Sequence, residues 1–268
     1  MSESKQGWAL VTGASAGLGV EFARQLAKRG HDIILVARRR QRLEELATEL
    51  EKNAKVKTLV LESDLSVAGA GAALIAELAK RDILPEILVN NAGVGAHGPA
   101  IDLPLEKAAA MIHLNIVSLT ELSIALGAKM SARGHGAIVN VASIGAFQPA
   151  PFFGTYAATK AYVESFSGAL THELAPRGVR VLCHCPGPTR TEFNDAGGVT
   201  IEGGDFFYMS AEQCVRIALR ALDHGKRLVV TGFVNNIAAW LGRTMPRAIV
   251  LFVAAKIMKP PPSPTLPA

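Results

Sequence analysis

Short, strongly apolar runs alternate with longer, more polar runs along most of this 268-residue chain. Most of the short runs are apolar over four or five consecutive residues, which is typical of strands buried on both faces of a sheet. Strands that face water on one side would instead alternate apolar with polar residues. We therefore predict seven buried strands, at 8–13, 32–38, 56–63, 86–93, 136–143, 179–187 and 227–232.

Helical patterns occupy the intervals between these strands. The last of them opens with Ser210, a favourable N-cap, and closes with Gly225, a favourable C-cap. Strand–helix alternation requires right-handed crossovers and a parallel sheet. We predict an α/β fold, a single doubly wound domain with a seven-stranded parallel sheet and helices on both faces. The expected helices lie at 40–53, 72–81, 105–133, around 156–160 and at 210–225.

A glycine-rich turn, TGASAGLG at 12–19, directly follows the first predicted strand and opens a helical pattern. Gly13, Gly17 and Gly19 permit a tight turn and bring backbone N–H groups close to a diphosphate at a helix N-terminus. A mononucleotide P-loop is disfavoured because no Gly-Lys-Ser/Thr follows. The context predicts a Rossmann-type dinucleotide site over an ordinary turn.

The second predicted strand ends in VARRR at 36–40, where an NAD enzyme usually carries a carboxylate for the ribose 2′-hydroxyl. Here Ala37 is followed by Arg38 and Arg39, which can bind a 2′-phosphate, and Ser15 can add a hydrogen bond. The alternative is a solvated basic helix start, but arginine is unfavourable at a helix N-terminus. We predict NADP(H), preferred over NAD(H).

Tyr156 and Lys160 in YAATK share one face of a helix, because four residues make little more than one turn. Such a pair can be a surface accident, or an acid and the cation that tunes it. A phenol has a pKa of about 10, and a cation about 4 Å away can be worth up to about 4 kcal/mol. We therefore expect Lys160 to lower the pKa of Tyr156.

Several motifs together resemble the short-chain dehydrogenase/reductase family over residues 7–232. They are TGASAGLG, NNAG at 90–93, the asparagine of HLNIVS at 113–118, Ser143, YAATK and PGPTRT at 186–191. The resemblance implies an NADP(H)-dependent oxidoreductase that transfers hydride between nicotinamide and a carbonyl or alcohol, with Tyr156 as general acid/base.

The resemblance also implies roles for the other catalytic residues. Lys160 would bond the nicotinamide ribose, Ser143 would hold the substrate oxygen, and Asn115 would hold a water that relays protons. Outside the motif set, Ser143 would be an ordinary strand-end hydroxyl and Asn115 a tolerated polar residue. The implied catalytic residues are Asn115, Ser143, Tyr156 and Lys160.

The implied cofactor contacts lie along six separate segments of the chain. Asp64 has a second interpretation, since an aspartate before Leu-Ser is also typical of a helix cap. The implied set is Gly13, Ser15, Gly17, Leu18, Gly19, Arg38, Arg39, Asp64, Asn91, Ala92, Gly93, Tyr156, Lys160, Pro186, Gly187, Thr189 and Thr191.

Aromatic residues near the motifs indicate a small-molecule carbonyl or alcohol substrate that is apolar rather than acidic. The candidate substrate contacts are Ser143, Phe147, Phe153 and Phe193, although several aromatics could equally pack the core. Arg190 could serve an acyl-thioester phosphate, which makes a 3-oxoacyl-thioester reductase the alternative. In a different class, a non-catalytic NADP(H)-binding regulator would not need Ser143, Tyr156 and Lys160 together.

The basic character of the chain is confined to its C-terminal part. Six lysines and arginines and no acidic residue follow Asp223, which accounts for the formal net charge of +5 and argues against nucleic-acid binding. We expect a catalytic domain over 1–232, an amphipathic helical extension of it over 233–259 and a disordered proline-rich tail over 260–268. The extension could be a dimer interface, a lid or a peripheral membrane contact, of which we favour the first two.

The number and positions of the cysteines indicate the cellular compartment in which the protein is expected. Their number, three, is odd, and Cys183 and Cys185 lie in an apolar run, so we expect a reducing, cytoplasmic location and no disulfides. We expect no metal site, since alternation on a strand would separate His184 from both thiols. No signal peptide or transmembrane helix is expected, because 228–242 is shorter than the ~20 residues a span needs. The expected assembly is a homodimer or homotetramer.

Overall fold

A computed structural model describes residues 6–192 and 208–259 of the chain. It contains a seven-stranded parallel sheet with strand order β3-β2-β1-β4-β5-β6-β7. The predicted α/β class and the seven strands are thereby confirmed. The strands are β1 (Gln6–Thr12), β2 (His31–Ala37), β3 (Thr58–Glu62), β4 (Ile87–Asn90), β5 (Gly136–Val141), β6 (Val179–Cys185) and β7 (Leu228–Val230).

Helices connect the strands and extend the chain beyond β7. The α-helices are α1 (Gly17–Lys28), α2 (Arg40–Ala54), α3 (Ala70–Lys80), α4 (Leu105–Ile112), α5 (Leu119–Arg133), α6 (Gly154–Leu174), α8 (Ala211–Asp223), α9 (Phe233–Thr244) and α10 (Arg247–Ile257). The 3₁₀-helices are η1 (Ala100–Asp102), η3 (Ile144–Phe147) and η4 (Ala175–Arg177). A π-helical segment, η2 (His113–Ser118), joins α4 to α5, so the single helix predicted over 105–133 is continuous but changes its hydrogen-bond pattern around Asn115.

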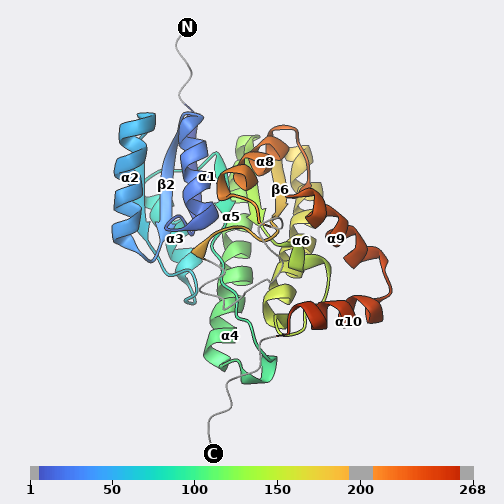
Figure 1. Cartoon of the computed structure of the whole chain (residues 1–268). Helices are drawn as coiled ribbons and strands as arrows, with labels where there is room; N and C mark the ends of the chain where they lie inside the picture. Colours follow the sequence, from blue (N-terminus) through green and yellow to red (C-terminus); the bar gives the residue numbers. More distant parts are fainter. Residues whose placement is uncertain (1–5, 193–207, 260–268) are drawn as a thin grey trace, which may run out of the picture.

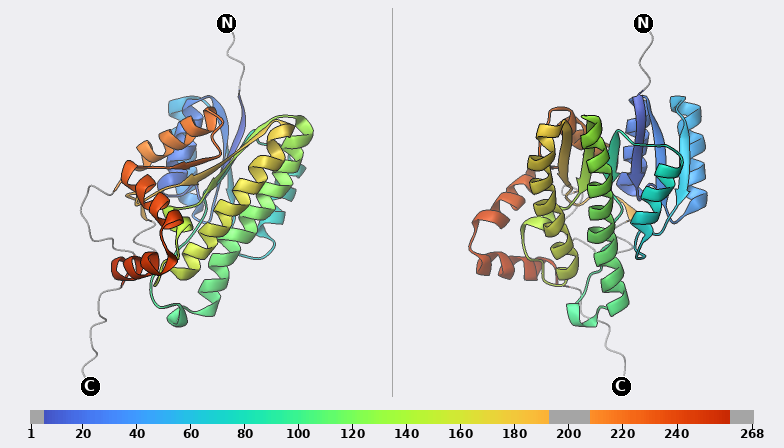
Figure 2. Two further views of the ribbon diagram at one scale, coloured as in Figure 1. Left: turned by 90° about the vertical axis from the view of Figure 1, so that its right-hand side faces the viewer. Right: turned by 180° about the vertical axis from the view of Figure 1, so that it is seen from behind.

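The sheet lies between two helical layers (Figures 1 and 2). Helices α1, α2 and α8 cover one face with side chains such as Phe22, Leu43 and Leu219. Helices α3, α5 and α6 cover the other with side chains such as Leu78 and Leu126. Both faces of the central strands are therefore buried, which explains their unbroken apolar sequence.

Alternate side chains of one strand pack into the two cores on opposite faces of the sheet. In β2, Ile33 and Leu35 belong to the first core, whereas Ile34 and Val36 belong to the second. All four side chains have 0% exposure. The same alternation in β6 places the sulfurs of Cys183 and Cys185 3.7 Å apart on one face and His184 beside Cys214 on the other.

The helical run from Leu105 to Arg133 has the length and composition of a membrane-spanning segment, with a mean hydropathy of 1.5 in its most apolar window. The run was predicted as a helix, and no transmembrane helix was expected. Leu122, Leu126 and Met130 on this run pack into the core beside β4 and β5. The run serves as a sheet-covering helix in this fold.

A buried polar cluster fixes α5 and α6 to the centre of the sheet. Asn90 Nδ2 donates to Ser123 Oγ and to Asn140 Oδ1, each at 2.9 Å. Asn140 Nδ2 donates to Ser167 Oγ at 3.0 Å. Asn90 Oδ1 is buried without a partner among the described residues. The bonds that the two amides do make favour one packing arrangement, because a slip would leave further buried polar groups unpaired.

Replacing Asn140 should therefore destabilise the domain. We expect Asn140→Ala to lower the free energy of unfolding by about 2 kcal/mol, because it leaves buried partners unpaired. Urea denaturation measures this loss. Ser167→Ala, which removes a single bond of the cluster, should cost less. Equal stability of Asn140→Ala and wild type would contradict the assigned role.

Candidate active site

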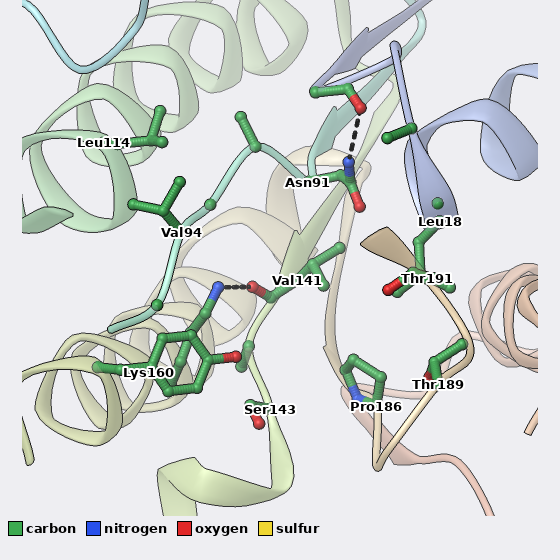
Figure 3. Close-up of a pocket in the computed structure, with 18 of the residues that line it drawn as sticks. Leu18, Asn91, Val94, Leu114, Val141, Ser143, Lys160, Pro186, Thr189 and Thr191 are labelled. Atoms are coloured by element: carbon green, nitrogen blue, oxygen red, sulfur yellow. Dashed lines mark hydrogen bonds between the residues drawn. The ribbon is translucent and has the colours of Figure 1, made fainter. Parts of the chain in front are cut away.

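A cavity of about 470 Å³ lies at the carboxyl ends of β1, β4, β5 and β6. This is the edge at which open parallel sheets bind ligands. Figure 3 shows side chains from separate segments converging on it. The predicted site residues that line it are Gly13, Ser15, Gly17, Leu18, Arg38, Arg39, Asp64, Asn91, Ala92, Gly93, Ser143, Phe153, Tyr156, Lys160, Pro186, Gly187, Thr189 and Thr191.

The glycine-rich turn between β1 and α1 has a conformation that only glycine adopts without strain. Gly13 and Gly17 have φ angles of +66° and +54°. Gly19 has no such angle, but a Cβ there would collide with Gly13 O and the Asn91 amide. A Cβ on Gly17 would lie 2.9 Å from the Thr191 side chain. The three glycines therefore let the start of α1 approach the segments after β4 and β6.

Thr12, the last residue of β1, holds this turn against the segment after β4. Its Oγ1 accepts hydrogen bonds from the backbone N–H groups of Asn91 and Ala92, each at 3.0 Å. Asn91 Nδ2 donates to Thr12 O at 2.9 Å. Asn91 lines the cavity as predicted, and its amide braces the turn. The sequence analysis quoted Thr12 in the motif without assigning it a role.

Arg39 lies where the sequence predicts a phosphate-binding arginine. Its Nε donates to Ser15 Oγ at 3.2 Å, and its Nη1 bonds Glu192 at 2.8 Å. Arg42 also bonds Glu192, at 2.6 Å, and these two bonds hold the pKa of Glu192 below its usual value. Neither Arg42 nor Glu192 was among the predicted site residues, and the two lie 150 residues apart in the chain.

Arg38 and Asp64 form a loose ion pair at the same end of the cavity, with 3.7 Å between Nη1 and Oδ2. Asp64 Oδ1 also accepts bonds from the N–H and hydroxyl of Ser66, at 3.0 and 2.6 Å. Burial opposes ionisation of Asp64, but the Ser66 bonds and the Arg38 charge outweigh it and lower its pKa. Asp64 therefore lines the cavity and caps the following turn, while its contact with the cofactor stays a prediction.

Tyr156 and Lys160 lie one turn apart on α6, and both side chains are buried. Lys160 Nζ donates to Val141 O at 2.8 Å and lies 5.7 Å from the centre of the Tyr156 ring (Figure 3). Burial raises the pKa of Tyr156 to about 12 and lowers the pKa of Lys160 to about 8. The expected lowering of the Tyr156 pKa by Lys160 is therefore wrong for the chain alone, because loss of water around both groups dominates.

Ser143 lies two residues beyond β5. Its Oγ accepts the Gly145 N–H at 3.1 Å and caps η3. A hydrogen bond between the Ser143 and Tyr156 side chains partly offsets the effect of burial on the tyrosine pKa. The serine is therefore both a capping residue and a neighbour of the buried phenol.

Asn115 lies behind the cavity, in the π-helical segment, with 0% exposure. Its Oδ1 accepts the Val94 N–H at 3.0 Å, and its Nδ2 donates to Val94 O and Thr159 Oγ1, each at 2.9 Å. The amide thus fixes the segment after β4 to η2 and α6. Thr159, which the sequence analysis did not name, is part of this connection.

The predicted substrate contacts are not all brought to the cavity. Phe153 lines it, with its ring centre 4.4 Å from that of Tyr156. Phe147 packs instead in a core cluster beside α9, under the guanidinium of Arg243. Phe193 lies outside the described residues. Val94, Leu114, Ile144 and Met258 complete the apolar wall, and Met258 had no local signal in the sequence.

The residues present fit a dinucleotide. The glycine cradle leaves room for a diphosphate at the start of α1, and arginine guanidinium groups lie at one end of the cavity. Tyr156, Lys160 and Ser143 lie together at the other end, next to the carboxyl end of β5. The residues from Pro186 to Thr191 run beside the cavity between these two groups.

The hydrogen bonds that Thr12 Oγ1 accepts can be tested with two substitutions of similar size, Thr12→Val and Thr12→Ser. We expect Thr12→Val to lose about 2 kcal/mol of unfolding free energy, because two backbone N–H groups lose their acceptor. Dinucleotide affinity should fall with it. Thr12→Ser keeps the hydroxyl and should stay near wild type in both thermal unfolding and calorimetric titration. Similar behaviour of the two variants would contradict the brace.

Comparisons with known proteins place these features in a family. A model of the short chain dehydrogenase family matches residues 7–198. Hydroxysteroid dehydrogenase-like protein 1 from Gallus gallus is 35% identical over 246 residues, which cover 90% of this chain and 73% of that protein. A very-long-chain 3-oxoacyl-CoA reductase from Pyricularia oryzae is 38% identical over 183 residues, covering 66% of this chain and 54% of the reductase. The match thus spans little more than half of that reductase.

Solved structures give the same result. A short-chain dehydrogenase from Sphingobium yanoikuyae in complex with NADPH is 31% identical, with a TM-score of 0.78 and coverage of 91% of this chain and 97% of that one. A 7beta-hydroxysteroid dehydrogenase gives a TM-score of 0.82 at 26% identity, with 93% and 96% covered. The chain belongs to the short-chain dehydrogenase/reductase family and is an oxidoreductase whose fold binds a nicotinamide cofactor.

Proposed function

We propose that this enzyme is an NADP(H)-dependent reductase of an apolar carbonyl compound, or the reverse dehydrogenase. The observation that carries the proposal is the convergence of Ser143, Tyr156 and Lys160 on one cavity next to the glycine turn. A protein that only sensed the cofactor would have no use for this buried acid and cation. The set therefore favours catalysis over regulation.

Tyr156 is the proton donor in the proposed reduction. The nicotinamide, when bound, supplies hydride to the carbonyl carbon. The carbonyl oxygen gains the proton of Tyr156. The residue holds this proton at neutral pH, as an ordinary tyrosine does, and burial raises its pKa further, to about 12. Ser143, bonded to Tyr156, lies where it can donate to the same oxygen. The Lys160 ammonium, next to the phenol, stabilises the phenolate left behind.

The arginines at the far end of the cavity support NADP(H). Arg38 and Arg39 line that end, and Ser15 bonds Arg39. Ala37 ends β2, so the position that would carry a carboxylate in an NAD enzyme has no charge to repel a 2′-phosphate. Arg38 and Arg39, which pair with Asp64 and Glu192 in this structure, carry the guanidinium groups that would bind it. The NADPH complex of the Sphingobium relative is consistent with this assignment.

The apolar wall supports a hydrophobic substrate. Val94, Leu114, Phe153 and Met258 surround the end of the cavity that holds Tyr156. Among similar proteins are a 7beta-hydroxysteroid dehydrogenase and a bulky-bulky ketone specific alcohol dehydrogenase from Comamonas testosteroni. A long-chain 3-oxoacyl thioester is the second candidate, because several similar proteins are very-long-chain 3-oxoacyl-CoA reductases.

A substrate panel tests the reaction class. We expect wild type to oxidise NADPH with bulky apolar ketones or 3-oxoacyl thioesters, followed by absorbance at 340 nm. Tyr156→Phe removes the transferable proton and should lower kcat by at least about 100-fold, the scale of general acid catalysis. Its NADPH affinity should remain close to wild type. Tight NADPH binding without turnover across the panel would favour the regulator.

The pH profile tests the buried lysine. Because Lys160 has a pKa lowered to about 8, its ammonium is present below that pH and lost above it. We expect kcat/KM for reduction to be level near pH 6–7 and to fall as pH rises through about 8. Oxidation, which needs Tyr156 to accept a proton, should instead rise toward alkaline pH. A reduction profile that stays level to pH 10 would contradict the role of Lys160.

The cofactor preference is tested at Arg39. We expect Arg39→Ala to weaken NADPH binding by about 10-fold or more, the value of a charge-assisted bond, and to leave NADH binding nearly unchanged. Arg42→Ala is the matched control, since Arg42 shares the Glu192 contact but does not line the cavity. Equal losses of NADH and NADPH affinity in Arg39→Ala would show that Arg39 does not recognise the 2′-phosphate.

A further inference from the structure

The two helices after the sheet carry an apolar stripe on their outer side. In α9 the exposed apolar residues recur at the spacing of one helical face. They are Phe233, Ile237, Trp240 and Leu241, with Phe233 81% and Trp240 62% exposed. The buried residues of α9, Asn235 and Ala239, lie on its opposite face.

Helix α10 exposes apolar residues over a wider part of its circumference. Val250 and Ala254 are its buried residues. Its exposed apolar residues are Ile249, Leu251, Phe252, Val253 and Ile257, with Phe252 61% and Ile257 66% exposed. The figures show α9 and α10 together at one margin of the molecule, away from α1 and α2 (Figures 1 and 2). We call the exposed faces of these two helices, residues 233–259, the C-terminal face.

Positive charge accompanies these apolar side chains. Arg247, Lys256 and Lys259 are exposed, and Lys256 Nζ lies 4.5 Å from the centre of the Phe252 ring. The sequence contains no acidic residue after Asp223. The face therefore combines large apolar side chains with uncompensated cations, the composition of helices that lie in the interface of anionic membranes.

The inner sides of both helices are fixed to the rest of the enzyme. Arg243 of α9 bonds Glu164 at 2.6 Å, and a Cβ on Gly187 would collide with Asn235. Beyond α10, Met258 lines the cavity, and its carbonyl lies 2.7 Å from His97 Nε2. The outward orientation of the stripe is thus set by contacts on the opposite side, and α10 leads directly to the cavity wall.

We propose that the C-terminal face docks this enzyme onto an anionic lipid surface, with Phe233, Trp240, Phe252 and Ile257 entering the interface. A second copy of the chain is the less suitable occupant. A twofold contact through this face would place two copies of a surface with cations and no carboxylate against each other, so the charges of Arg247 and Lys256 would not be offset by residues of 233–259. Phosphatidylserine headgroups supply the missing negative charge.

Trp240 provides a direct reporter. The chain has two tryptophans, and Trp8→Phe leaves Trp240 as the single fluorophore. We expect its emission to shift to the blue with vesicles of phosphatidylserine and phosphatidylcholine, and to change little with phosphatidylcholine alone. No substrate or cofactor is present, so the result does not depend on the proposed reaction. An unchanged spectrum with the anionic vesicles would overturn the proposal.

Two variants separate the apolar and charged contributions in vesicle sedimentation. Ile249→Ser with Phe252→Ser should abolish binding. Arg247→Gln with Lys256→Gln should weaken it about 30-fold, at about 1 kcal/mol per cation near the surface. Val67→Ser is the matched control, because Val67 is 57% exposed on another segment.

Circular dichroism and thermal unfolding confirm that each variant is folded, and size-exclusion chromatography reports its assembly. Retained vesicle binding by the double serine variant would contradict the proposal. A loss of oligomer in that variant, with no vesicle binding by wild type, would assign the face to a second copy instead.

Discussion

One buried hydrogen bond, from Lys160 Nζ to Val141 O, joins the chemistry of this enzyme to its fold. Val141 is the last residue of β5, so the bond ties α6 to the carboxyl edge of the sheet. It holds the ammonium next to Tyr156, and both side chains are buried. Burial keeps the phenol protonated and makes the ammonium easier to deprotonate, so the site opposes the charged form of both groups.

The cofactor end is organised by backbone contacts more than by side-chain charge. Thr12 and Asn91 lock the strand ends of β1 and β4 to each other, and the glycines let α1 start directly beside them. Asn115 performs a similar task deeper in the molecule, where it fixes Val94 to α6 through Thr159. Polar groups therefore position the cavity from behind, while apolar residues form its wall.

Local sequence pattern predicted the strands, the glycine turn and the Tyr156–Lys160 pair, because each depends on residues close together in the chain. Glu192 and Met258 could not be found this way, since they reach the cavity only through tertiary packing. The same holds for Arg42, which lies outside the cavity and bonds Glu192 from 150 residues away. Phe147 was wrongly predicted to contact the substrate. Its ring packs in the core beside α9, and an aromatic residue in the sequence suits either position. The direction of the Tyr156 pKa shift also depended on burial, which spacing does not reveal.

The central claim is that Tyr156 holds its proton in a desolvated site, and an ultraviolet pH titration tests it most directly. The difference at 295 nm between wild type and Tyr156→Phe, without cofactor, isolates the ionisation of this phenol among the three tyrosines. Our account predicts no phenolate signal from Tyr156 below pH 10, in keeping with a pKa of about 12. A titration midpoint well below 10, the ordinary value for tyrosine, would show that the lysine field outweighs burial and would contradict the account.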